Sequence, residues 1–181
     1  MTTQNNAFLT PLPVFSAQSR DELKRVVDDC LGVSSEDNCP TRLHGPIGKW
    51  DVSQVTDMSK LFYKKDTFNY DLSNWDVSRV TDMRGMFAYT LSFNQDLSKW
   101  DVSRVTTMVA MFRDAASFNQ DLSNWDVSRV INMSGMFEGA NSFQQTLCGA
   151  AWVKSKASKV DMFTHSLGSI SDTVCGTWML W

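Results

Sequence analysis

Aspartate recurs at a fixed spacing in this 181-residue chain, and its carboxylate could bind cations, hydroxyl groups or backbone N–H groups. Four copies of the phrase Trp-Asp-Val-Ser place one aspartate every 25 residues, at Asp51, Asp76, Asp101 and Asp126. An arginine column stands three residues after the last three of these, at Arg79, Arg104 and Arg129. A serine stands two residues after each of these aspartates, as at Ser78 and Ser103. We predict that these columns bind a partner.

Carboxylates that stack on one another repel, so the aspartate column needs compensation. At the strand spacing of about 4.8 Å, neighbouring aspartates repel by roughly 1–3 kcal/mol. Ion pairs with the arginine column would offset this repulsion, as would hydrogen bonds from backbone or hydroxyl groups at the turn. The third alternative is a Ca²⁺ ion that bridges the stacked oxygens, because calcium prefers hard oxygen ligands. We predict no other cofactor and no other metal site.

Groups that could carry catalysis are sparse in this sequence. The two histidines, His44 and His165, stand far apart and outside any metal-binding or triad pattern. In a second acidic column, each aspartate stands two residues after an asparagine; its members are Asp71, Asp96 and Asp121. That spacing is typical of turn residues that satisfy the backbone of their own loop. We therefore predict that the protein is not an enzyme.

A 25-residue repeat must position these columns. Tryptophan opens each copy, at Trp50, Trp75, Trp100 and Trp125, and four units cover residues 51–150 without insertion or deletion. A fixed period of this size is typical of a solenoid, in which each unit buries its apolar face by stacking on its neighbours. We therefore predict an α/β solenoid in which residues 25 apart are vertical neighbours.

Two periodicities follow one another within each unit. Trp75 and Val77 alternate with polar residues, as in a half-buried strand. Met83, Met86 and Phe87 then follow at helical spacing. We predict one parallel strand and one short helix or helical turn per repeat. The predicted inward columns start at Trp50, Val52, Val55, Met58, Phe62 and Phe68 and recur every 25 residues.

These phrases resemble known repeat families. Ile/Leu-x-x-Trp-x-Val resembles the strand of leucine-rich repeats, and WDVSxVTxMxxMF…FNxDLS resembles the repeat of the bacterial surface protein family called BspA-like. The resemblance covers about 51–150. It implies a leucine-rich-repeat-like right-handed coil at the cell surface, with a role in adhesion and protein binding and no enzymatic activity.

The chain outside the repeats is predicted to cover the two open ends of the solenoid. Residues 1–18 are expected to form a tail and 19–46 a helical N-terminal cap, because the apolar residues of 20–31 fall on one helix face. The four-repeat solenoid spans 47–150, and 151–181 forms a degenerate repeat with an irregular C-terminal cap. Trp178 and Trp181 are expected to pack on the last repeat, and the alternative is self-association through the C-terminus.

The four cysteines lie in the two caps. Four cysteines allow three pairings, and the local pairs Cys30–Cys39 and Cys148–Cys175 would fix each cap without crossing the solenoid. Two such bridges predict an oxidising compartment, and the alternative is four buried thiols in the cytosol. No signal peptide is visible at Met-Thr-Thr-Gln-Asn. From the bridges and the family resemblance we expect a secreted or cell-surface location.

Composition narrows the function class. The 17 basic and 20 acidic residues give a net charge of −3, without the strongly basic surface that nucleic-acid binding needs. No apolar run approaches the roughly 20 residues of a membrane helix, so no membrane insertion is expected. We expect a surface recognition or adhesion module whose partner is an extracellular protein or glycan. A structural or self-assembling spacer and a calcium-dependent adhesin are the alternatives.

Overall fold

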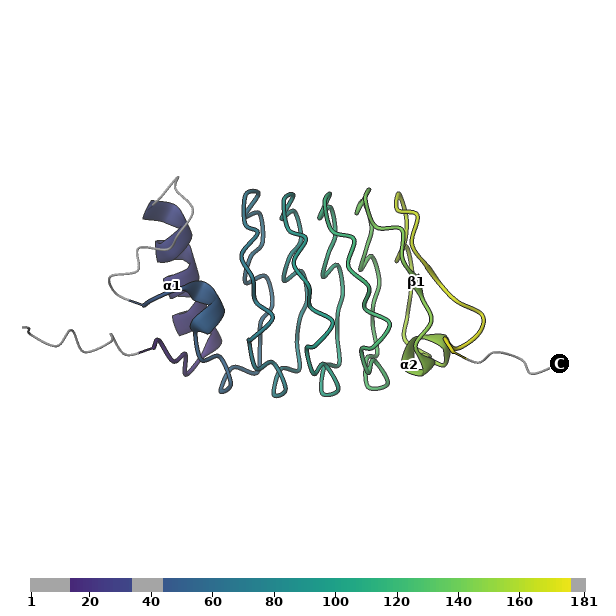
Figure 1. The fold of residues 1–181 in the computed structure, drawn as a ribbon, viewed down its shortest axis with the longest axis horizontal. Helices are drawn as coiled ribbons and strands as arrows, with labels where there is room; N and C mark the ends of the chain where they lie inside the picture. The colour runs from purple at the N-terminus through teal and green to yellow at the C-terminus, as the bar shows by residue number, and fades with distance from the viewer. Residues whose placement is uncertain (1–13, 34–43, 177–181) are drawn as a thin grey trace, which may run out of the picture.

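The computed structural model describes residues 14–33 and 44–176, which run as a row of narrow loops with a helix near each end (Figure 1). Helix α1 (Arg20–Val33) covers one end, and the 3-10 helix η1 (Ile47–Lys49) leads into the first loop. Helix α2 (Ala150–Val153) lies at the other end. There, strands β1 (Thr146–Leu147) and β2 (Ser169–Ile170) pair in parallel, with Thr146 opposite Ser169. We number the loops 1 to 5 from the tryptophan that opens each, namely Trp50, Trp75, Trp100, Trp125 and Trp152.

The predicted α/β solenoid, a leucine-rich-repeat-like right-handed coil with a strand and a helix in each repeat, is wrong. Between residues 50 and 145 the described chain forms turns and isolated bridges, and its one sheet consists of β1 and β2. Residues 25 apart are still neighbours, because single bridges join Asp57 to Asp82, Asp82 to Thr107 and Thr107 to Asn132. The repeats are therefore stacked, turn-rich loops.

Local hydrogen bonds replace the predicted strand around Trp75 and Val77. Asp76 Oδ1 accepts a hydrogen bond from the Ser78 N–H at 3.0 Å, and the Val80 N–H donates to the Val77 carbonyl at 2.9 Å. Both bonds close within the loop, so these N–H groups do not pair with a neighbouring strand. The alternation of buried and exposed residues here comes from successive turns.

Left-handed residues replace the predicted helix around Met83 and Phe87. Two positions in loop 2 have positive backbone φ, +58° at Gly85 and +60° at Tyr89, whereas a right-handed helix needs negative φ throughout. The same two positions are left-handed in loop 3, at Ala110 and Asp114. Met83 and Phe87 are nevertheless buried. The helical spacing therefore identified the inward side chains without identifying the backbone conformation.

Alternate N–H groups in this left-handed segment bind the next loop. In loop 2, the N–H groups of Met83, Gly85, Phe87 and Tyr89 donate to carbonyls of loop 3 at 2.7–3.1 Å. The N–H groups between them bond within loop 2, as Met86 does to the Met83 carbonyl. Loops 1, 3 and 4 show the same alternation. Each loop is thus joined to the next by a row of parallel hydrogen bonds.

The predicted inward columns are confirmed as the core. The repeat tryptophans are at most 4% exposed, and the valine, methionine and phenylalanine columns are buried beside them. A buried indole N–H needs an acceptor. Trp100 Nε1 donates to the Leu72 carbonyl at 3.0 Å, and Trp125 Nε1 donates to the Leu97 carbonyl at 2.9 Å. Tryptophan therefore fills the core and also ties loops 2, 3 and 4 to the chain 28 residues earlier.

Phenylalanine rings form a second continuous column. Phe87 and Phe112 stack with centroids 5.5 Å apart and planes 5° from parallel, and Phe112 and Phe137 repeat this geometry at 5.5 Å and 2°. Such ring pairs add to the stabilisation that burial alone gives. Phe163 of loop 5 stacks on Phe137 at 5.6 Å. The ring column therefore runs through the last loop.

Helix α1 closes the row at loop 1. Its apolar face, which includes Leu23 and Val27, joins the core. The Ser19 hydroxyl accepts a hydrogen bond from the Glu22 N–H at 3.2 Å and caps the helix. The Arg20 guanidinium donates to the Ser59 carbonyl at 3.0 Å, where a preceding loop would place an N–H. The helix thus substitutes for a neighbouring loop in both packing and hydrogen bonding.

The predicted Cys148–Cys175 disulfide is confirmed, with Cα atoms 5.1 Å apart. Together with the Cys175 N–H, which donates to the Cys148 carbonyl at 2.9 Å, it holds the segment after β2 against β1. Cys39 lies outside the described residues, and so does its predicted pairing with Cys30. The predicted packing of Trp178 and Trp181 also falls outside them.

Substitution of Gly149 tests how closely neighbouring loops pack against each other. A Cβ at this position would overlap the Ser123 carbonyl oxygen, a backbone atom of the adjacent loop. We expect Gly149→Ala to lower the free energy of unfolding by about 1–3 kcal/mol, as overpacking does. Gly32→Ala in α1 is the matched control: its Cβ would meet nothing within 4 Å, so it should raise stability by about 0.5–1 kcal/mol. Equal urea-unfolding curves for the two variants would contradict this packing.

Candidate functional site

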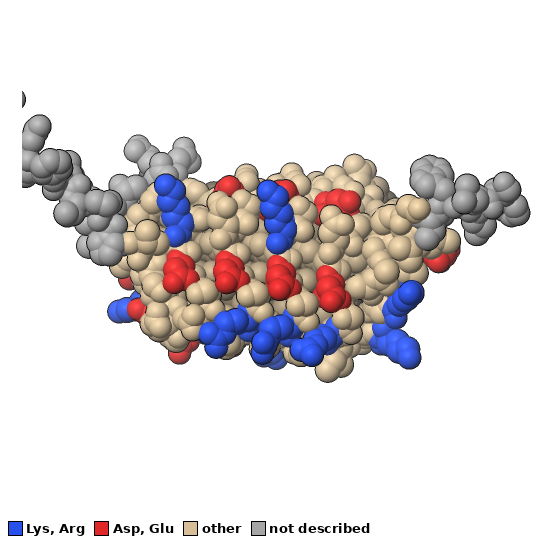
Figure 2. Space-filling model, turned by 60° about the horizontal axis from the view of Figure 1, so that its bottom comes forward, with Lys and Arg blue, Asp and Glu red and all other residues tan. Residues whose placement is uncertain are grey.

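One face of the stacked loops carries the predicted partner-binding columns. Figure 2 shows a row of acidic side chains along this face, with basic side chains on either side of the row. The exposed aspartates spaced 25 apart are Asp51, Asp76, Asp101 and Asp126, and the exposed arginines are Arg79, Arg104 and Arg129. We call these two columns, together with the half-buried Ser78 and Ser103, the striped face.

Serine N–H groups hold the aspartates of the striped face in place. Asp101 Oδ1 accepts from the Ser103 N–H at 3.0 Å, and Asp126 Oδ1 accepts from the Ser128 N–H at 3.0 Å. The turn hydrogen bonds that the sequence offered as compensation are therefore present. Within the described residues, Asp101 Oδ2 has no hydrogen-bond partner. The Asp101 carboxylate therefore keeps one oxygen available to a ligand.

The same turns lower the pKa of several carboxyl groups. Hydrogen bonds from the Ser128 hydroxyl and N–H hold the pKa of Asp126 below its usual value, and the Arg129 charge adds to the effect. Ser53 and Ser16 lower the pKa of Asp51 by the same means. In the second acidic column, the backbone N–H of the serine two residues on lowers the pKa of Asp71 and of Asp96. Folding therefore favours the charged form of these groups.

The arginines of the striped face do not form ion pairs with the aspartates beside them in the part of the chain that the structure describes. Among the described residues, no salt bridge joins Asp76, Asp101 or Asp126 to an arginine of the striped face. Arg79 Nη1 donates to Gln54 Oε1 at 2.7 Å. Over the same described ranges, Arg104 and Arg129 have neither a hydrogen-bond nor an ion-pair partner. Turn hydrogen bonds, and not direct Asp–Arg pairs, fix the aspartates, and two guanidinium groups remain open.

The geometry gives the calcium alternative no support. Calcium takes six to eight oxygen ligands in proteins. In the part of the chain that the structure describes, no group of three or more Asp, Glu, His or Cys side chains is close enough to hold a metal ion. The weak candidates Asp51, Asp76, Asp101 and Asp126 lie in a line, and the Oδ1 of each accepts a serine N–H.

Sequence reasoning missed an asparagine ladder. Asn69 and its equivalents were expected to bind their own loop, but Asn69 Oδ1 accepts from the Asn94 N–H at 2.9 Å, and Asn94 Oδ1 accepts from the Asn119 N–H at 2.9 Å. Gln95 Nε2 also donates to Asn69 Oδ1, at 3.0 Å. Asp71 does bind its own loop, through the Ser73 N–H at 2.8 Å. The recurrence of Asn followed by Gln in adjacent repeats was the available signal.

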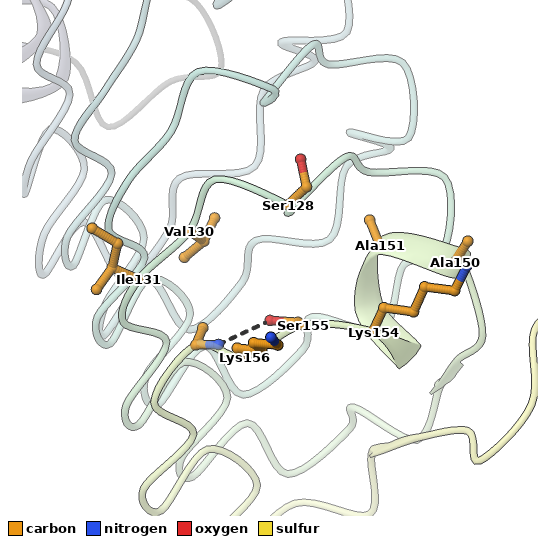
Figure 3. A pocket seen from close by; sticks show the side chains of 9 residues that line it. Ser128, Val130, Ile131, Ala150, Ala151, Lys154, Ser155 and Lys156 are labelled. Atoms are coloured by element: carbon orange, nitrogen blue, oxygen red, sulfur yellow. Dashed lines mark hydrogen bonds between the residues drawn. The ribbon is translucent and has the colours of Figure 1, made fainter.

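A hollow that no motif indicated lies beside α2, where the repeat period breaks (Figure 3). Its volume is about 540 Å³, and its walls include Ile131, Ala150 and the lysines Lys154 and Lys156. Ile131 is 72% exposed. Ser128, which follows Asp126 on the striped face, also lines the hollow. The signal for it was the 27-residue gap between Trp125 and Trp152, since two extra residues must leave the regular path.

Comparison with known proteins gives one relationship. A profile of the family described as "Mycoplasma protein of unknown function, DUF285" matches residues 34–167. Comparisons with curated proteins and with solved structures gave no match. No helix among residues 14–33 and 44–176 is both long and apolar enough to cross a bilayer.

The lowered carboxyl pKa values predict acid sensitivity. The unfolded chain, with ordinary aspartate pKa values, binds protons at a higher pH than the folded chain. The stabilisation is therefore complete above the ordinary value and is lost as pH falls through the lowered folded values. Asp96→Asn keeps the acceptor of the turn but removes the charge, so its stability should fall less between about pH 7 and about pH 3. Urea unfolding measures the difference.

Asp96→Ala is the companion variant, because it removes the acceptor as well as the charge. It should lose about 1 kcal/mol already near neutral pH. A pH dependence of Asp96→Asn equal to that of the unmodified chain would contradict the role given to this turn.

Proposed function

This chain belongs to the family described as Mycoplasma protein of unknown function, DUF285, and we propose that it serves as a recognition and adhesion module. In this proposal it is secreted or displayed at the cell surface, and it binds an extracellular protein or glycan through the striped face. It carries out no reaction. The resemblance of WDVSxVTxMxxMF to BspA-like surface repeats supports the assignment.

The open arginine column beside a fixed aspartate row is the observation that carries the proposal. Arg104 and Arg129 are exposed and unpaired within the described residues, whereas the aspartates beside them are fixed by Ser103 and Ser128. A surface whose polar groups are already ordered loses little conformational freedom on binding. Arginine is also enriched among residues that dominate binding energy at interfaces. We therefore assign the main contact energy to the arginine column.

The disulfide supports an extracellular setting for this module. Cys148 and Cys175 are bonded, and such bonds persist in oxidising compartments. Because the bond ties β1 to the segment after β2, it also stabilises the end of the row of loops that lies opposite α1. A surface protein that must keep a long, exposed face in register benefits from such a fixed end.

A second candidate, end-to-end assembly, is favoured by the open edge of loop 5. Loop 5 keeps the left-handed positions of the other loops, at Asp161 and His165. Over the described ranges, the N–H groups of Lys159, Asp161, Phe163 and His165 have no hydrogen-bond partner, although their equivalents in loops 1 to 4 all donate to a next loop. A row of free donors can take a further chain segment that offers carbonyl oxygens.

The polarity of this edge limits how copies could assemble. Two loop 5 edges would oppose donors to donors, so a symmetric pair through this edge is unfavourable. Head-to-tail stacking would require the carbonyls of loop 1, but α1 covers that end and Arg20 already binds the Ser59 carbonyl. Recognition through the striped face needs no such displacement, and it remains the first candidate.

Charge reversal tests the striped face. Ligands are first identified by screening the full chain against arrays of extracellular proteins and glycans. Arg104→Glu should then weaken binding of a ligand so identified by at least about tenfold, because it places a negative charge in the contact column. Arg25→Glu, at an exposed position of α1, is the control with the same charge change and should leave binding intact. Binding by Arg104→Glu that equals the unmodified chain removes this face from the proposal.

Light scattering over a range of protein concentrations separates the two candidates. The recognition module should remain monomeric at every concentration, since its partner is a different molecule. An average mass that rises with concentration would instead favour assembly through the loop 5 edge. Hydrogen exchange at Asp161 and Phe163 would then identify the contact, because their N–H groups exchange rapidly unless another chain covers them.

A further inference from the structure

A second hollow lies across loops 1, 2 and 3 and shares no residue with the striped face. Its volume is about 570 Å³, within the range typical of small-ligand sites. Small residues form part of its lining, namely Gly85, Ala88 and Ala110. The larger lining side chains are cationic or aromatic: Arg20, Lys60, Tyr63, Arg84, Tyr89 and Arg113. No acidic residue lines it. We call this site the basic hollow.

The lining residues come from equivalent positions of three successive loops. Lys60, Gly85 and Ala110 occupy the first left-handed position of loops 1, 2 and 3, with φ between +53° and +58°. A Cβ on Gly85 would lie 3.4 Å from the Lys60 side chain. The small residues in loops 2 and 3 therefore leave the space that a long side chain at this position would fill.

Tyr63, Tyr89 and Lys60 line one wall of the basic hollow, and Lys64 lies beside this wall, against both tyrosine rings. Tyr63 and Tyr89 meet edge to face with ring centroids 5.5 Å apart. Lys64 Nζ lies 5.3 Å from the Tyr63 ring centroid and 5.8 Å from that of Tyr89, and Lys60 Nζ lies 5.7 Å from the Tyr63 centroid. Cation–π contacts of this length orient an ammonium group without neutralising its charge.

The two lysines are the cations that remain free to bind. Arg84 is paired with Asp82 at 2.7 Å, and Arg113 is paired with Glu138 at 2.7 Å. Within residues 14–33 and 44–176, neither Lys60 nor Lys64 has an ion pair, and neither phenol oxygen of Tyr63 and Tyr89 has a hydrogen-bond partner. The wall thus offers the Lys60 ammonium group and two phenol hydroxyls, and Lys64 adds a second ammonium group beside it.

We infer that the basic hollow binds an acidic glycan, a sugar chain that carries carboxylate or sulfate groups. Lys60 and Lys64 would bind the anionic groups, the phenols of Tyr63 and Tyr89 would bind sugar hydroxyls, and the rings would contact the apolar face of a sugar. The site is independent of the striped face, so either proposal can fail alone.

A sugar chain fits the surroundings better than a nucleic acid does. Continuous phosphate binding needs an extended basic surface. Around the basic hollow, the carboxylates of Asp82, Asp114 and Glu138 lie close to the lining arginines. They would repel a long polyanion, whereas a short oligosaccharide with one charge per sugar or fewer can place its charges at the two lysines.

Titration calorimetry on the full chain tests this site with four probes: a κ-carrageenan octasaccharide, an oligogalacturonate, a neutral dextran oligosaccharide and a single-stranded oligouridylate. We expect binding of the sulfated carrageenan probe, the galacturonate probe or both, and none of dextran. The two acidic probes distinguish sulfate from carboxylate recognition. No binding of either, or tighter binding of the oligouridylate, overturns the inference.

Matched variants locate the binding. Lys60→Gln combined with Lys64→Gln should weaken binding of the acidic probe by at least about tenfold. Lys49→Gln combined with Lys99→Gln removes the same charge from exposed positions outside the basic hollow and should change affinity less than about threefold. Tyr63→Leu should also weaken binding, because its ring and phenol are lost. Equal losses in the two lysine pairs, or unchanged binding by Tyr63→Leu, would mean general charge attraction and overturn the assignment. Thermal unfolding confirms that each variant is folded.

Discussion

The alternation of N–H direction along each loop is the constraint on which the rest of the structure depends. One N–H binds within its own loop and the following one binds the next loop, as Met86 and Phe87 do. This alternation needs left-handed residues at two fixed positions, which is why Gly85 and Tyr89 have positive φ. Because every loop repeats it, the side chains between these positions point into the core at the same level in each loop.

Side-chain hydrogen bonds reinforce this backbone pattern from three sides. The tryptophan indoles bond to carbonyls in the core, as Trp100 does to Leu72. On the surface, Asn94 joins one loop to the next, while Asp101 closes a turn within its own loop. The polar columns therefore have distinct tasks. Asparagine and tryptophan hold loops together, and aspartate shapes each loop while leaving an oxygen and the neighbouring arginines to face solvent.

Much of the arrangement could be predicted from the period alone. The stacking of residues 25 apart and the burial of the Trp, Val, Met and Phe columns follow from the repeat, because only stacking can bury so many identical apolar positions. The Cys148–Cys175 bond followed from the positions of the cysteines. The rows of charges on the striped face followed in the same way, since equal positions in stacked loops must lie on one side.

The backbone conformation could not be predicted by the same reasoning. The alternation of buried and exposed side chains around Trp75 and Val77 can arise from a strand or from successive turns. The hydrogen bond from the Ser78 N–H to Asp76 shows that this segment forms turns. The spacing of Met83 and Phe87 indicates that their side chains face the core. Non-glycine residues in the left-handed conformation, such as Tyr89 and Ala110, cannot be recognised from the sequence. The basic hollow was missed for a related reason. It combines residues from α1 and three different loops, which no motif joins.

Successive loops offer the same N–H donors and the same carbonyl acceptors to their neighbours, and this limits how such chains can change in length. A whole 25-residue segment inserted between two loops would receive the N–H groups of one neighbour and offer its own to the other, so neither terminal cap would need to change. An insertion of any other size would have to leave the path, as the extra residues before Trp152 do in forming α2. Duplication or loss of complete units is therefore the tolerated route by which proteins of this architecture can lengthen or shorten their exposed face.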